Sequence, residues 1–280
     1  MFTRITNSWE LVKASAAVLR ADKELIVFPI VSSIGVLIVT ATFAVPMLLA
    51  GVFDSLLAGE SRVLGTVVAF LFYVVQYLVI FFANSALVGA AMIRLRGGDP
   101  TIGDGIRIAF GHLGAILGYA LIAATVGLIL NWLSERRGNL GRIAASLLGL
   151  AWNIATFLVV PVLVEEGLGP VDALKRSVEL LKKTWGEQIA GNLSISLVFG
   201  LLTFVAILLG VPAIVLAAMS ESVALIVLAV LLLVLVLLFI GLISSTLSGI
   251  FTAAVYQYAV TGATGDYFRE DLVQNAFRRK

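Results

Sequence analysis

Six apolar stretches, each long enough to cross a lipid bilayer, dominate this 280-residue sequence. A transmembrane helix needs about 20 mostly apolar residues to cross about 30 Å of hydrocarbon, and it satisfies its own backbone hydrogen bonds there. Only 13% of the residues are charged, whereas soluble domains carry about a quarter. We therefore expect an all-α polytopic membrane protein that forms a single integral membrane domain over residues 1–280. The six expected spans are Leu25–Gly51, Val63–Ile93, Leu113–Leu133, Ile143–Val164, Ile189–Met219 and Val223–Val260.

A short amphipathic basic segment precedes each pair of spans. The first and third copies align without a gap, with Ser8, Glu10, Leu11 and Lys13 falling on Ser177, Glu179, Leu180 and Lys182. The middle copy is shorter and begins with Thr101 and, three residues later, Asp104, a spacing typical of a capping box. A unit repeated in this way predicts three helical hairpins, each preceded by an amphipathic interfacial helix. The units are 1–97, 98–168 and 169–265, and residues 266–280 form a basic cytoplasmic tail.

The positions of the basic residues predict the orientation of the chain. All but four of the 19 Lys and Arg residues lie on the side of the membrane that holds both termini. Short loops rich in Lys and Arg stay in the cytoplasm, so both termini should be cytoplasmic. Because these residues lie at the ends of spans, they favour anionic lipid headgroups over nucleic acid as the partner. The four exceptions are Arg62, Arg136, Arg137 and Arg142.

The amphipathic segments are the first candidate site. Apolar residues recur at helical spacing along the first segment and again along the third, with basic residues on the opposite side. Such helices bind at the headgroup boundary, where they either sense anionic lipid or serve as elbows that fix the hairpins, and the two roles are compatible. The candidate interfacial residues are Trp9, Lys13, Lys175, Arg176, Lys182, Lys183 and Trp185.

Neutral polar residues within the spans are the second candidate site. The span interiors carry almost no ionisable groups, which argues against a proton-coupled transporter or an ion pump. The polar residues would line a route or a lipid-headgroup groove, or else form interhelical hydrogen bonds worth about 0.6–2 kcal/mol each. The candidate polar path consists of the neutral residues Asn84, Ser85, Asn153, Asn192 and Ser245, together with Glu165 and Glu166 at the cytoplasmic end of the fourth span.

No residue pattern points to catalysis. The chain has no cysteine, which excludes disulfides and thiolate chemistry, and one histidine, His112. A single imidazole does not make a metal site, and no nucleophile has an evident base partner. We expect no enzyme activity, no metal and no cofactor.

The sixth apolar stretch is too long for a simple crossing. Its 38 residues, Val223–Val260, would span about 57 Å as an α-helix. It must tilt, break near Gly241 or Gly249, or continue beyond the membrane as one helix.

The run from Val159 to Pro170, continuing into Ala173–Ser177, resembles an uncharacterised family of bacterial six-span membrane proteins. Ser8–Leu11, Asp22–Leu25 and Ala254–Ala259 fit the same pattern. That family is distantly similar to the membrane domain of some glycerophosphodiester phosphodiesterases, whose catalytic domain has no counterpart in this chain. The resemblance implies a bacterial inner membrane protein.

These observations favour a non-enzymatic membrane protein that organises or senses the bilayer, and that forms a homo-oligomer. The alternative is a transporter or channel for a small or lipidic solute that uses the neutral polar residues. A break in the sixth span would favour the alternative, because transporter sites often lie at broken helices.

Overall fold

The computed structural model describes residues 2–49, 62–136, 138–185, 194–220, 222–263, 265–269 and 273. The regular structure of these residues is helical and contains no strand, which confirms the all-α prediction. The elements are α1 (Phe2–Ala21), the 3-10 turn η1 (Lys23–Ile26), α2 (Val27–Leu49), α4 (Arg62–Leu95), α5 (Ile102–Gly111), α6 (Leu113–Arg136), α7 (Gly138–Ala155), α8 (Val159–Glu165), α9 (Pro170–Trp185), α10 (Ser194–Met219) and α11 (Val223–Thr261).

Within the described residues, six segments are long and apolar enough to cross a membrane, as the sequence predicts. They are Lys23–Leu49, Val63–Leu95, Leu113–Glu135, Gly141–Glu165, Val198–Met219 and Val223–Thr261. Their bounds agree with the expected spans to within a few residues wherever both can be compared. Gly51 and Ile189, the expected end of the first span and start of the fifth, lie outside the described residues.

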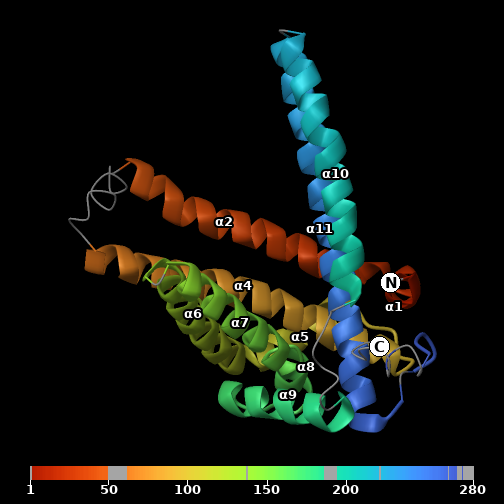
Figure 1. Cartoon of the computed structure of the whole chain (residues 1–280). Helices are drawn as coiled ribbons and strands as arrows, with labels where there is room; N and C mark the ends of the chain where they lie inside the picture. Colours follow the sequence, from red (N-terminus) through yellow and green to blue (C-terminus); the bar gives the residue numbers. More distant parts are fainter. Residues whose placement is uncertain are drawn as a thin grey trace.

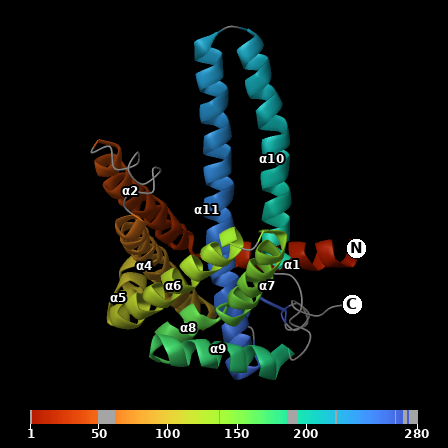
Figure 2. The same cartoon turned by 60° about the vertical axis from the view of Figure 1, so that its left-hand side comes forward.

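The long helices pack mainly against their neighbours in sequence. Helix α2 packs on α4, α6 on α7, and α10 on α11. In Figure 1, α10 and α11 rise together away from the rest of the molecule, while α2 and α4 extend in a different direction. Helix α1 contacts α10 and α11 and lies across them near the point where the pairs meet (Figure 2).

The buried core lies where the C-terminal halves of α4 and α11 meet α1, α8 and α9. Fully buried side chains from all five helices meet there, among them Leu11, Leu87, Leu163, Leu180 and Ile250. The same end of the molecule holds α5, which begins with the predicted capping box. The Thr101 hydroxyl accepts from the Asp104 N–H, and the Asp104 carboxylate accepts from the Thr101 N–H. The Thr101 hydroxyl also donates to the Asp104 Oδ2 at 2.7 Å, and this hydrogen bond, together with the one from the Thr101 N–H, lowers the pKa of Asp104.

Helix α11 is continuous, so the sixth span neither breaks at Gly241 nor at Gly249. Its side chains are exposed or half-buried from Val223 to Ser245 and then mostly buried from Thr246 to Tyr256. The first part is long enough to cross a bilayer, and the second part is one of the helices of the buried core. This division accounts for the length of the span.

The helix of the fourth span is interrupted by a turn. Helix α7 ends at Ala155 and α8 begins at Val159, with a turn between them. Pro161 explains the break, because proline has no N–H to donate and its ring clashes with the carbonyl four residues earlier. That carbonyl belongs to Phe157, within the turn. The broken helix that the transporter alternative expects in the sixth span therefore lies in the fourth span.

Candidate functional site

A layer of ion pairs ties the helices together at the core end of the molecule. The Arg94 Nε lies 3.1 Å from the Asp22 Oδ2, and the same guanidinium also contacts Asp99. Arg96, which directly follows α4, pairs with Glu165 at the end of α8. These contacts join the residue between α1 and η1, the C-terminal end of α4 and the end of α8, which are distant in the sequence.

Glu166, Arg176 and Tyr256 form the most connected part of this layer. The Arg176 Nε donates to both carboxylate oxygens of Glu166, at 3.0 and 3.2 Å, and the Tyr256 hydroxyl donates to Glu166 Oε1 at 3.1 Å. The hydrogen bond to Glu166 raises the pKa of Arg176. Helix α9 is thereby joined through one carboxylate to both α8 and α11.

The three lysine candidates of α9 occupy its outer side. Ala173, Ser177, Leu180 and Leu181 are buried against the core, whereas Lys175, Lys182 and Lys183 are exposed. The Lys175 Nζ lies 3.0 Å from Asp172. Arg176 is the one candidate in α9 that faces inward to an acidic partner.

The remaining interfacial candidates are in α1 and at the end of α9. Trp9 is 47% exposed, and the Lys13 Nζ lies 2.8 Å from Glu10. The side chain of Trp185 lies outside the part of the chain that the structure describes.

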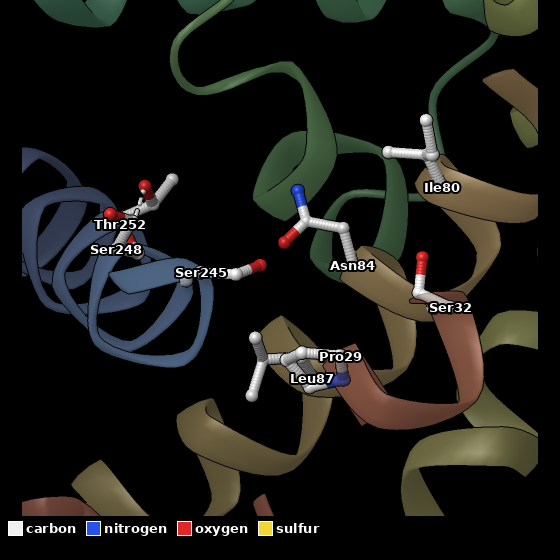
Figure 3. A pocket seen from close by; sticks show the side chains of 10 residues that line it. Pro29, Ser32, Ile80, Asn84, Leu87, Ser245, Ser248 and Thr252 are labelled. Carbon is white, nitrogen blue, oxygen red and sulfur yellow. Dashed lines mark hydrogen bonds between the residues drawn. The ribbon is translucent and has the colours of Figure 1, made fainter. Parts of the chain in front are cut away.

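A pocket of about 210 Å³ lies between α2, α4 and α11 at the edge of the core. Figure 3 shows Asn84 and Ser245 facing each other across it, with Ser32 on the α2 side and Ser248 and Thr252 further along α11. The lining is uncharged throughout. It consists of Pro29, Ser32, Ile80, Ala83, Asn84, Leu87, Ser245, Ser248, Gly249 and Thr252.

Close contact between two helices closes the pocket on the core side. Gly249 of α11 faces Leu87 of α4, and a Cβ at Gly249 would lie 2.4 Å from the Leu87 Cδ2. Only glycine allows α4 and α11 to approach so closely here. The Ile80 and Ser245 side chains at the opposite rim are exposed, so the pocket opens at the surface.

The structure brings together only part of the predicted polar path. Asn84 and Ser245 share the pocket, while Ser85 is buried beside it and its Oγ has no partner in the described structure. Asn153 is exposed on α7, away from the pocket, and Asn192 lies outside the described residues. Glu165 and Glu166 belong to the ion-pair layer.

Several site residues were not singled out from the sequence. Ser32 and Thr252 line the pocket, and Arg96 and Tyr256 are the partners of the two glutamates. No sequence signal links these pairs, since 69 residues separate Arg96 from Glu165 and 90 separate Glu166 from Tyr256.

Groups suited to metal binding or catalysis were searched for in the described residues. No cluster of three His, Cys, Asp or Glu side chains occurs among them. The His112 Nδ1 lies 2.9 Å from the Ile108 carbonyl of the preceding turn, a local helix-end contact.

Comparison with known proteins gives one match. The profile of a family of unknown function, DUF6159, matches residues 63–268. No curated protein and no solved structure matches the chain. The resemblance to the membrane domain of glycerophosphodiester phosphodiesterases finds no support in these comparisons.

Proposed function

We propose that this chain, which belongs to the family of unknown function DUF6159, organises or senses the lipid bilayer and has no enzymatic activity. In this proposal it is a homo-oligomer in the bacterial inner membrane, with both termini in the cytoplasm. It consists of three units, in which α1, α5 and α9 are interfacial helices that precede the pairs α2–α4, α6–α7 and α10–α11. The ends of the long helices that carry the ion-pair layer face the cytoplasm.

The position of α9 is the observation that carries the proposal. One face of α9 contacts α6, α7, α8 and α11, and the other presents Lys175, Lys182 and Lys183. An exposed basic helix beside span ends is attracted to anionic lipids by about 1 kcal/mol for each Lys near the surface. Because α9 contacts four other helices, a change in its lipid contacts would reach two of the three units.

The test is lipid selection by the protein in nanodiscs that contain phosphatidylcholine and phosphatidylglycerol. Native mass spectrometry would count the anionic lipids retained by the wild type and by the triple variant Lys175→Gln, Lys182→Gln, Lys183→Gln. Since each lysine contributes about 1 kcal/mol, the triple variant should lose most of its preference for phosphatidylglycerol.

A matched control is the charge-conserving triple variant Lys175→Arg, Lys182→Arg, Lys183→Arg, which changes the same three exposed positions of α9 but keeps their positive charge. This variant should retain the phosphatidylglycerol preference. The proposal fails if the triple variant selects phosphatidylglycerol as strongly as the wild type does.

The alternative is a transporter or channel for a small or lipidic solute. The uncharged pocket between α2, α4 and α11 favours it, together with the interruption of the fourth span. Flux of uncharged solutes into proteoliposomes, compared between the wild type and Asn84→Leu, would test this alternative. Flux that Asn84→Leu abolishes would favour transport over bilayer sensing.

A further inference from the structure

The pocket between α2, α4 and α11 has polar groups without partners. Within the described residues, the Asn84 amide and the Ser245 hydroxyl make no hydrogen bond to the protein. The same holds for the Ser248 and Ser32 hydroxyls, whereas Thr252 donates to the Ser248 carbonyl of its own helix at 2.9 Å. These groups are half-buried or exposed at the pocket surface, so a ligand that enters the pocket can form hydrogen bonds with them.

The pocket lies at the end of a long exposed stretch in each of three helices. The stretches Ile30–Leu49, Val63–Phe82 and Val223–Ile243 are almost entirely exposed or half-buried. Each is about 30 Å long as a helix, which equals the thickness of the hydrocarbon core. Ser32, Asn84 and Ser245 each lie within three residues of the inner end of one of these stretches.

Where each stretch crosses the hydrocarbon, the pocket at its end lies in the glycerol and ester layer, which in the proposed topology belongs to the inner leaflet. The interfacial layer on each side of the hydrocarbon is roughly 5–8 Å thick, and it contains the ester carbonyls of diacyl lipids. The amide of Asn84 and the hydroxyls of serine are donors suited to neutral carbonyl oxygens. The absence of charge from the pocket lining disfavours a headgroup phosphate or a free ion.

We propose that this pocket binds a diacyl membrane lipid through its glycerol–ester portion. The volume of about 210 Å³ equals that of roughly seven water molecules, which suits the polar backbone of a lipid and excludes its acyl chains. The chains leave the pocket between the α2–α4 and α10–α11 pairs, which diverge from this point (Figure 1). Ile80 and Pro29 supply apolar contact at the rim.

The site is separate from the basic surface of α9, and the two proposals stand independently. Lipid recognition by α9 depends on headgroup charge. Recognition by the pocket depends on the ester carbonyls, which phosphatidylcholine and phosphatidylglycerol share. Either proposal can therefore fail while the other holds.

The experiment compares diester and diether lipids. The protein is reconstituted in nanodiscs of diester phosphatidylcholine or of its diether analogue, which lacks both carbonyls, and lipid retention is followed by native mass spectrometry during delipidation. The wild type should retain one diester lipid per chain and release the diether lipid about tenfold more readily. Asn84→Leu and Ser245→Ala should each reduce the retention of the diester lipid severalfold.

Asn153→Leu is the matched control, because it removes an exposed amide on α7 away from the pocket. It should retain the diester lipid as the wild type does, and the triple lysine variant of α9 should do the same. Ser245→Ala keeps the test informative if Asn84→Leu does not fold. Equal retention of diester and diether lipid overturns the proposal, as does retention that neither pocket variant changes.

The proposal of a bound lipid would also be overturned if the pocket held only water. The chain has no cysteine, so Ser248→Cys introduces a single thiol into the pocket. With lipid bound, a water-soluble thiol reagent should modify this thiol slowly in diester nanodiscs and faster in diether nanodiscs. Equally fast modification in both would identify water as the occupant.

Discussion

The Ser177 hydroxyl of α9 accepts a hydrogen bond from the backbone N–H of Leu158, at 3.1 Å, in the turn that interrupts the fourth span. The same hydroxyl donates to the Ala155 carbonyl at 2.7 Å, so one side chain serves both ends of the break. Ser177 is fully buried. A backbone group left unpaired at such a site costs as much as a lost hydrogen bond, so α9 stabilises the break in a neighbouring helix.

We therefore expect Ser177→Ala to destabilise the protein by about 1–3 kcal/mol, because it leaves the Leu158 N–H and the Ala155 carbonyl without a partner. Thermal unfolding in detergent, followed by tryptophan fluorescence, would measure the loss. Ser33→Ala is the control, because the Ser33 hydroxyl donates only to the Pro29 carbonyl of its own helix. Equal losses in the two variants would contradict a bridging role for Ser177.

The Tyr256 hydroxyl should couple α11 to α9 through Glu166. Tyr256→Phe removes one hydrogen bond to a partly exposed carboxylate, and we expect a loss of about 1 kcal/mol and faster amide exchange in α9. If the three groups act as one network, Tyr256→Phe and Arg176→Gln should be non-additive in a double-mutant cycle. Tyr73→Phe, which removes a hydroxyl from an exposed ring, should leave α9 exchange unchanged. Additive losses would show that Glu166 serves its two partners separately.

Helix α5 offers a pair of glycines that test its packing on the first unit. A Cβ at Gly105 would lie 2.5 Å from the Phe28 Cζ and 2.7 Å from the Ala86 carbonyl oxygen, whereas one at Gly111 would meet nothing within 4 Å. The backbone oxygen cannot move aside, so Gly105→Ala should cost about 1–3 kcal/mol. Gly111→Ala should be neutral or stabilising by up to about 1 kcal/mol, because alanine favours helix. Thermal unfolding would compare them, and an equally tolerated Gly105→Ala would contradict the close contact of α5 with α2 and α4.

The number, length and order of the spans could be predicted because hydropathy depends only on local sequence. The capping box at Thr101 and Asp104 could be predicted for the same reason. The break in the fourth span has a local signal in Pro161, but its stabilisation by Ser177 depends on tertiary contact.

The residues of the polar path were harder to predict. The sequence of an apolar span does not indicate which of its faces packs against a neighbouring helix. A helix that is apolar all round has no amphipathic stripe to orient it. Both Asn84 and Asn153 belong to the predicted polar path, yet only Asn84 lines the pocket beside α11. The ion pairs of Glu165 and Glu166 likewise depend on how helices distant in sequence are juxtaposed.

The distribution of basic residues makes the orientation in the membrane testable. The chain has no cysteine, so Lys13→Cys and Glu135→Cys each introduce one thiol, on exposed positions near opposite ends of the spans. Because Lys- and Arg-rich loops stay in the cytoplasm, a membrane-impermeant maleimide should label Glu135→Cys in intact cells and Lys13→Cys only after permeabilisation. The reverse pattern would place the ion-pair layer and α9 outside the cell, where the proposed contact of the α9 lysines with the inner leaflet is impossible. Labelling of both thiols in intact cells would place them on the same side of the membrane, and it would contradict the three crossings that separate α1 from the end of the third span in the proposed topology.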